Sequence, residues 1–379
     1  MDDAAAPVHT GIGTIIPIEP IIKVERLHAL GIIVADLEKS MREFSRFFGL
    51  EAWKVRSFKT GRNLKITGAD GASPQAEILL ATASTNGVVF ELYQPVSGDT
   101  VYSQFLKKGD RAHDMTVAVL SQAEFETVRQ RMAKEGVPIL QSVSLGDQAD
   151  VHYFDSFRQL AAVVKVVVPK AAGVKSLEDL PADRTVRHEL VNGHFPCDKA
   201  YHVCVNTNWR RLSVRESYAR IFGIKDWFEF DCITGFNQAN PRHRGRPADW
   251  SFRTMSGRRD AFAIEIVETV WGESGYTDML NDYGEGIHHL MTAFCDKEAV
   301  EATQKALAEE DYEYAQEGDT GPIYYCYLQK NGRLASLGIE AVCPIDDSWQ
   351  DHMVGAMRDG LFGPDRPDYA HPPLINKRG

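Results

Sequence analysis

The second half of this 379-residue chain carries histidine and glutamate in four short, mostly apolar segments. They are His202 in YHVCVN, Glu265 in AIEIVET, the pair His288-His289 in GEGIHHLMTAF, and Glu340 in LGIEAVCP. Imidazole and carboxylate groups together suit a borderline divalent cation such as zinc, nickel, cobalt, manganese or iron. Each of these residues alone could be an ordinary polar side chain, so the chemistry depends on whether the fold brings them to one point.

Two other groups of side chains could contact a substrate. Arg242, Arg244 and Arg246 lie in the segment NPRHRGRPADW and could bind a carboxylate or phosphate, as arginine forks do. A charged loop is more often a solvated surface. Tyr325 and Tyr327 alternate onto one face of a strand beside the last of the four segments, where they could line a pocket or pack in the core.

An internal repeat places these segments in a common architecture. A strand pattern followed by an amphipathic helix ends at Phe48-Gly49 in the first half and at Phe222-Gly223 in the second. Downstream, the glutamates of VFELYQP and AIEIVET lie 265 − 91 = 174 positions apart. GDRAHDMTVAV with GEGIHHLMTAF, and AVVKVVVP with LGIEAVCP, keep this offset within one residue. Four matches at one offset indicate that the two halves are duplicates.

Each half divides again into two similar units. In the first unit a strand pattern over 31–34 precedes an amphipathic helix, and three strand patterns follow. The second unit repeats this order with a helix over 123–135 that Gly136 ends, and the second half has its corresponding helix near 298–309. The pattern predicts an α+β protein made of four βαβββ modules.

Composition shifts predict the domain boundaries. Pro, Gly and charged residues are frequent at both ends and in the middle of the chain. We expect an N-terminal arm (1–20), a first two-module domain (21–168), a linker (169–197), a second two-module domain (198–345) and a C-terminal extension (346–379).

The composition also excludes several classes of partner. A net charge of −11 disfavours nucleic acid, and no apolar run approaches the ~20 residues of a membrane helix. The N-terminus lacks the features of a secretory signal, so we expect a cytoplasmic protein. All six cysteines lie in the second half and are expected to be buried thiols. The expected partner is a small-molecule substrate, which would be anionic if the arginine segment contacts it. We expect either a monomer, in which the internal duplication takes the place of a second subunit, or a homodimer.

The paired modules, the opening with strand, DLEKS, helix and Phe-Gly, and the GEGIHH segment resemble the vicinal-oxygen-chelate superfamily of glyoxalases, bleomycin-resistance proteins and extradiol dioxygenases. Within it, the nearest resemblance is to methylmalonyl-CoA epimerase and glyoxalase-like proteins. It covers roughly residues 24–168 and 198–344. The resemblance implies that each pair of modules closes a mostly antiparallel, eight-stranded, cup-shaped sheet, and that a metal lies inside.

In that superfamily the ligands come from the first and last strands of each paired module. At these positions the second half has His202, Glu265, His289 and Glu340, which implies one divalent metal ion. Adjacent residues of a strand point to opposite faces, so we expect only one histidine of the pair to face the cup. The register of the apolar strand that follows favours His289 over His288.

The matching positions of the first half are Ala29, Glu91, Asp114 and Lys165. An ammonium group in place of a ligand repels a cation. We therefore expect this half to be metal-free and structural. His113 precedes the ligand position by one residue, and alternation predicts that it faces away from the cup.

The resemblance implies Lewis-acid chemistry on a carbonyl or enolate-type substrate, with Glu340 as the base. The enzyme would then be an isomerase, an epimerase or a lyase. The alternative is a non-heme iron(II) dioxygenase of the extradiol or hydroxyphenylpyruvate type, whose ligands would be His202, His289 and Glu340 alone. Glu265 distinguishes the two, because a fourth ligand occupies a position that oxygen or substrate needs. A second alternative is a small-molecule binding or resistance protein.

Overall fold

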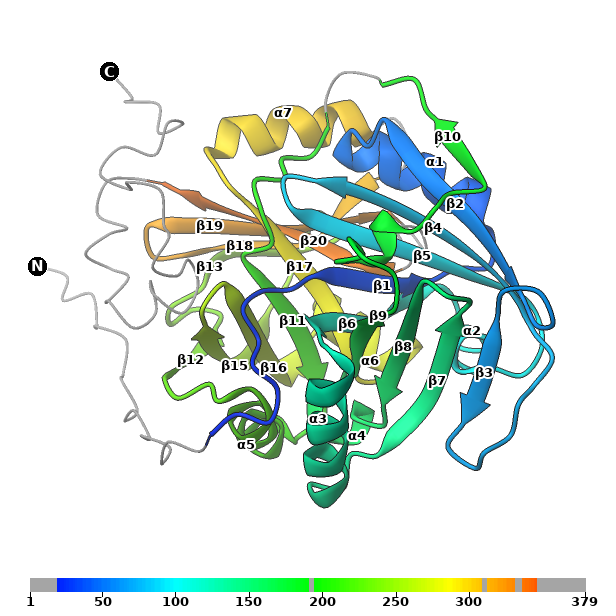
Figure 1. Cartoon of the computed structure of the whole chain (residues 1–379). Coiled ribbons are helices and arrows are strands. Elements are labelled where there is room, and N and C mark those ends of the chain that lie inside the picture. Colours follow the sequence, from blue (N-terminus) through cyan, green and yellow to red (C-terminus); the bar gives the residue numbers. More distant parts are fainter. Residues whose placement is uncertain (1–18, 191–193, 309–311, 331–335, 346–379) are drawn as a thin grey trace, which may run out of the picture.

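Two curled, mostly antiparallel sheets of ten strands each make up the part of the chain that the computed structural model describes, residues 19–190, 194–308, 312–330 and 336–345 (Figure 1). The predicted C-terminal extension, and all but the last two residues of the predicted arm, lie outside the described residues. The α+β class and the two cup-shaped sheets are confirmed, and each sheet has two strands more than the eight expected.

The sheets have the same plan. In spatial order the first is β10 (Arg184–Arg187), β2 (Ala52–Lys59), β4 (Glu77–Thr85), β5 (Val88–Ser97), β1 (Ala29–Ile33), β6 (Arg111–Val119), β9 (Val163–Pro169), β8 (Ala149–Phe154), β7 (Ile139–Leu145) and β3 (Lys65–Gly68). The second is β12 (Trp227–Ile233), β15 (Trp250–Arg259), β16 (Phe262–Gly272), β11 (His202–Thr207), β17 (Gly286–Phe294), β20 (Gly338–Pro344), β19 (Ile323–Lys330), β18 (Tyr312–Thr320), β13 (Ala239–His243) and β14 (Arg246–Pro247).

Strand pairing explains how each pair of modules forms one sheet. The first and last strands of a module pair in parallel, as β1 with β5 and β11 with β16 do. The two modules join through the antiparallel pairs β1 with β6 and β11 with β17. The short strands β3 and β13 cross from the first module to the far edge of the second, where they pair with β7 and β18. Strand β10, from the segment expected to be a linker, extends the first sheet beside β2.

The helices lie where the sequence predicts them. The module helices are α1 (Leu37–Phe48), α3 (Gln122–Lys134), α5 (Arg211–Phe222) and α7 (Lys297–Ala308). Shorter helices are α2 (Val101–Leu106), α4 (Phe157–Leu160), α6 (Gly275–Asp282) and the 3₁₀ turn η1 (Leu177–Asp179). Gly49 and Gly223 end α1 and α5 with φ of 68° and 69°, a left-handed conformation that glycine adopts without steric cost.

One hydrophobic core joins the two halves. It contains the buried faces of the module helices and the sheet residues that pack against them. Across the halves, the ring of Phe47 lies 5.1 Å from Phe195 and 5.3 Å from Tyr312, and the hydroxyl of Tyr218 donates to the Leu160 carbonyl at 3.1 Å. Two smaller clusters fill the opposite, inner faces of the sheets. All six cysteines are buried and free.

No helix among the described residues has both the length and the apolar character that crossing a membrane requires.

Candidate metal centre

The four predicted ligand positions lie on four neighbouring strands in the middle of the second sheet. His202 is on β11, Glu265 on β16, His289 on β17 and Glu340 on β20, and their exposed fractions range from 0 to 7 %. The apolar residues beside them along each strand pack in the shared core, and they are Val203, Ile264, Leu290 and Ile339. Alternation along the strands therefore turns the four polar side chains toward the inside of the cup.

The nitrogen and oxygen atoms of these side chains converge. Nε2 of His202 lies 3.2 Å from Nε2 of His289, and Oε2 of Glu340 lies 3.1 Å from each of these nitrogens. Oε2 of Glu265 is 3.3 Å from Nε2 of His289 and 3.7 Å from Nε2 of His202. Within the described chain, His202, His289 and Glu340 form a compact group with ligand atoms within 4.8 Å of one another, and Glu265 lies beside it.

This arrangement leaves oxygen lone pairs without a protein partner. Oε2 of Glu340 and Oε2 of Glu265 are both buried and make no hydrogen bond of acceptable geometry despite these short distances. Oε1 of Glu265 accepts a hydrogen bond from Oγ1 of Thr254 at 2.8 Å, which holds Oε2 toward the histidines. A buried polar atom without a partner is costly. A divalent cation would satisfy both oxygens and both imidazoles, so the residues present fit a metal ion.

The same groups shift one another's protonation. Burial alone would lower the pKa of His289, but the carboxylates of Glu340 and Glu265 outweigh burial and raise this pKa to about 9. Burial would raise the pKa of Glu340, but His289 and His202 lower it to about 2, and the same histidines lower the pKa of Glu265 against the effect of burial. A metal ligand must be deprotonated, so a cation and the proton on His289 compete for one place.

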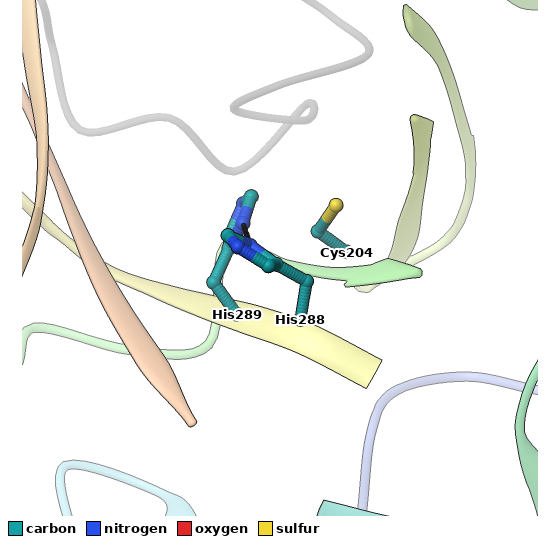
Figure 2. Close-up of side chains that lie close together, drawn as sticks. All are labelled: Cys204, His288 and His289. Carbon is teal, nitrogen blue, oxygen red and sulfur yellow. Dashed lines mark hydrogen bonds between the residues drawn. The ribbon is translucent and has the colours of Figure 1, made fainter. Parts of the chain in front are cut away.

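A β-bulge brings both residues of the His288-His289 pair to the inner face. In the pairing of β11 with β17, Cys204 opposes His289 and Val205 opposes Ile287, so that His288 is the extra residue. Figure 2 shows both imidazoles on the same side of β17, with Cys204 of β11 near them. The prediction that only one histidine faces the cup is wrong, because strict alternation fails at a bulge.

The first half has the same bulge. Gly31 opposes Asp114 and Ile32 opposes Ala112, which leaves His113 as the extra residue. His113 is buried, and its Nδ1 lies 2.9 Å from Oδ2 of Asp114. The prediction that His113 faces away from the cup is wrong for the same physical reason.

A buried ion-pair network occupies the place of a metal centre in the first half. Lys165 on β9 pairs with Glu91, and its Nζ lies 2.6 Å from Oδ1 of Asp114. Burial would lower the pKa of Lys165, but Asp114 and Glu91 raise it. Burial would raise the pKa of Asp114, but Lys165 and His113 lower it. An ammonium group thus neutralises the two carboxylates that a cation would use.

A cavity lies next to the carboxylates of the second half. It encloses about 510 Å³ of empty space, part of it open to solvent. Its lining is Phe230, Cys232, Gln238, Phe252, Glu265, Thr320, Ile323, Tyr325, Tyr327, Glu340 and Val342. Glu340 opposes Tyr327 and Val342 opposes Tyr325 in the pairing of β19 with β20, so the cavity extends along these strands away from the carboxylates.

The predicted tyrosines reach this cavity. Tyr325 and Tyr327 line it, while Tyr324 packs in the shared core. The hydroxyl of Tyr325 donates to Oε1 of Gln238 at 2.8 Å, and the hydroxyls of Tyr327 and Tyr276 lie 2.6 Å apart.

The predicted arginines do not reach it. Arg242, Arg244 and Arg246 are exposed, and none of them lines the cavity. Arg244 pairs with Asp278 at 3.0 Å and with Glu313 at 2.7 Å. The expected clamp for an anionic substrate is therefore not part of this site, because β13 and β14 hold these side chains at the edge of the sheet.

Sequence reasoning did not single out several residues of the site. Phe252 and Thr254 occupy alternate positions of β15, beside the strand of Glu265, and their period of two could have indicated an inner face. Gln238 lies between β12 and β13, directly after the turn at 235–237, and no local pattern marks it. Tyr276 comes from α6 and meets the site only through the tertiary fold.

No family model matches the chain, and no curated protein matches it either. Among solved structures, the chain is similar to a triple mutant of 4-hydroxymandelate synthase from Streptomyces coelicolor, with a TM-score of 0.52 and 13% sequence identity. The match covers 85% of this chain and 93% of that chain. At this identity the likeness shows the fold alone, and the chain has the vicinal-oxygen-chelate fold.

Proposed function

We propose that this chain is a non-heme iron(II) dioxygenase that acts on a small oxygenated substrate with an apolar, ring-bearing body. The observation that carries the proposal is the compact group of two imidazoles and one carboxylate, His202, His289 and Glu340. Two histidines and one carboxylate on one side of a metal, with the other positions open, are typical of iron(II) oxygenases. The likeness to a hydroxymandelate synthase supports this reading over an epimerase.

The metal, when bound, would supply the redox chemistry by which dioxygen reacts with an organic substrate. The protein residues would have simpler tasks. His202 and His289 would each present Nε2, and Glu340 would present Oε2, from rigid strands in the middle of the sheet. Burial of these groups would keep bulk water away from the reacting atoms.

The cavity suggests the class of substrate. Its walls are mainly aromatic and aliphatic, and neither lysine nor arginine is among its described lining residues. The oxygenated end of a substrate would therefore face the metal, while an aromatic ring would lie between side chains such as Phe252 and Val342. Gln238 and Tyr325, already joined by a hydrogen bond, offer polar groups farther along the cavity. Aromatic 2-oxo acids and catechols have this shape.

A Lewis-acid isomerase, epimerase or lyase is the second candidate. It is favoured by Oε2 of Glu265, which is buried without a hydrogen bond 3.3 Å from Nε2 of His289 and could complete a four-ligand set. In that case Glu340 or Glu265 would also be placed to move a proton at a carbon next to a carbonyl.

The substitution Glu265→Gln separates the two candidates. The amide keeps the size of the side chain and can still accept from Thr254, but it is a poor metal ligand. The dioxygenase reading makes Glu265 a neighbour of the ligands and not a ligand itself, so it predicts a fall in iron(II) affinity of no more than about 10- to 100-fold. Competition against a chelator measures this affinity. Complete loss of metal from Glu265→Gln protein that remains folded would support the four-ligand reading instead.

A further inference from the structure

We propose that His288 is a positioning residue whose Nδ1 accepts a hydrogen bond from Nδ1 of His289 and thereby directs Nε2 of His289 to the metal. The inference rests on the metal centre proposed above and assigns a function to a second histidine of the pair. A metal-binding imidazole usually donates its other N–H to an acceptor, which fixes both the ring orientation and the tautomer.

The geometry of the pair fits this role. The two Nδ1 atoms lie 2.9 Å apart, and the two rings are nearly perpendicular at 82°. Two nitrogens at this distance need a proton between them. Nε2 of His289 faces His202 and Glu340, so the two nitrogens of this ring contact different groups.

The environment of His288 decides which ring carries the proton. Nε2 of His288 lies next to Gly275, and the ring makes a hydrogen bond with the Gly275 backbone. The Gly275 N–H already donates to Oε1 of Gln316 at 3.1 Å, so the carbonyl is the group left for His288. A carbonyl can only accept, and Nε2 of His288 must therefore carry its proton.

The tautomers of both rings follow from this bond. A neutral His288 with a proton on Nε2 has a lone pair on Nδ1, which accepts the proton of His289 Nδ1. His289 can then offer the lone pair of Nε2 as a ligand. The Gly275 carbonyl therefore fixes the tautomer of His288, and His288 in turn makes Nε2 the ligand atom of His289.

Packing keeps His288 in place. Its ring centroid lies 4.4 Å from that of Tyr276 and 5.6 Å from that of Tyr327, and its exposed fraction is 4 %. Tyr327 also stacks on His289 at 4.5 Å. The two imidazoles are therefore held by a shared aromatic wall, which limits rotation of either ring.

The first half has an equivalent contact between the bulge residue and the residue that follows it, but no metal centre. His113 occupies the same bulge position, and its Nδ1 contacts the carboxylate of Asp114, which stands where His289 stands in the second half. In both halves the bulge residue thus orients the side chain that follows it. This makes His113 the matched control for His288.

Cobalt(II) binding, measured by competition against a chelator, tests the inference. His288→Leu removes the acceptor and should lower cobalt affinity by about 10- to 100-fold, the range for loss of an orienting partner. His288→Asn places an amide oxygen near the former Nδ1 and should recover most of this loss, while His113→Leu should retain wild-type affinity. Unchanged affinity in folded His288→Leu protein would overturn the positioning role. Absence of cobalt binding by the wild type would overturn the metal centre itself.

A second measurement does not depend on the stability of these variants. In zinc-loaded wild-type protein with ¹⁵N-labelled histidine, NMR should show a protonated Nδ1 and a metal-bound Nε2 for His289, and an unprotonated Nδ1 for His288. Cys204, His288 and His289 also form a compact group of ligand types. Zinc bound to Nδ1 of His289 would place the ion in that group and would overturn the inference.

Discussion

Replacing His289 or Glu340 with alanine should remove most of the metal that the wild-type chain binds, which we expect to be about one equivalent. Loss of an orienting partner alone costs about 10- to 100-fold in metal affinity, and loss of a direct ligand should exceed this range. Nε2 of His289 lies 3.1–3.3 Å from atoms of His202, Glu265 and Glu340. Oε2 of Glu340 lies 3.1 Å from Nε2 of both histidines, so each substitution breaks up the set. Elemental analysis of protein purified without chelators would measure the loss.

The first half provides the controls for this experiment. His113→Ala and Asp114→Asn change the equivalent strand β6, and we expect both variants to keep the metal. If they lost it, or if the wild type bound two equivalents, the first-half centre would be functional and the assigned role of Lys165 would be wrong. Retention of the metal by Glu340→Ala would remove this glutamate from the ligand set.

Lys165→Met should destabilise the protein by about 3–5 kcal/mol, the usual cost of removing one partner from a buried ion pair. Lys165 is fully buried, and its removal leaves Glu91 and Asp114 as uncompensated carboxylates that are at most 1 % exposed. Because folding lowers the pKa of Asp114, the ionised carboxylate stabilises the folded protein at pH values above its ordinary pKa of 3.8. This stabilisation is lost as the pH falls through the folded-state pKa. Because folding raises the pKa of Lys165, the ammonium group stabilises the folded protein at pH values below its ordinary pKa of 10.5. This stabilisation is lost as the pH rises through the higher folded-state pKa. At pH 7 both contributions are present.

Urea unfolding at pH 7, followed by circular dichroism, would measure this loss. Lys170→Met is the matched control, because Lys170 pairs with Asp150 at the surface with a third of its side chain exposed. Such surface pairs contribute about 0–1 kcal/mol. Equal unfolding midpoints for the two variants would contradict the structural role assigned to the buried network.

Much of this site could be predicted from the sequence because one offset relates the two halves. The offset aligned four strands, and the superfamily pattern then identified His202, Glu265, His289 and Glu340, which the fold brings together on adjacent strands. This alignment needed only apolar patterns and turn residues, which local physical chemistry determines.

The remaining features depend on register and tertiary contacts. The bulges at His113 and His288 interrupt strict alternation, and their one local sign is a pair of consecutive polar residues within an apolar strand. The short edge strands β3, β10, β13 and β14 have two to five residues and no clear alternation, so the sheets were expected to be narrower. The arginine segment resembles an anion site in composition, but the topology places it at an edge.

Oxygen uptake during turnover tests the proposed function most directly. Chain loaded with iron(II) would be mixed with a panel of aromatic 2-oxo acids and catechols, in air and in an anaerobic chamber, while an oxygen electrode and product analysis run in parallel. The proposal predicts uptake of about one O₂ per product formed, no turnover without oxygen, and no turnover by Glu340→Ala. Turnover that continues without oxygen, persists with zinc or nickel and exchanges substrate hydrogen for solvent deuterium would contradict it and establish the Lewis-acid alternative.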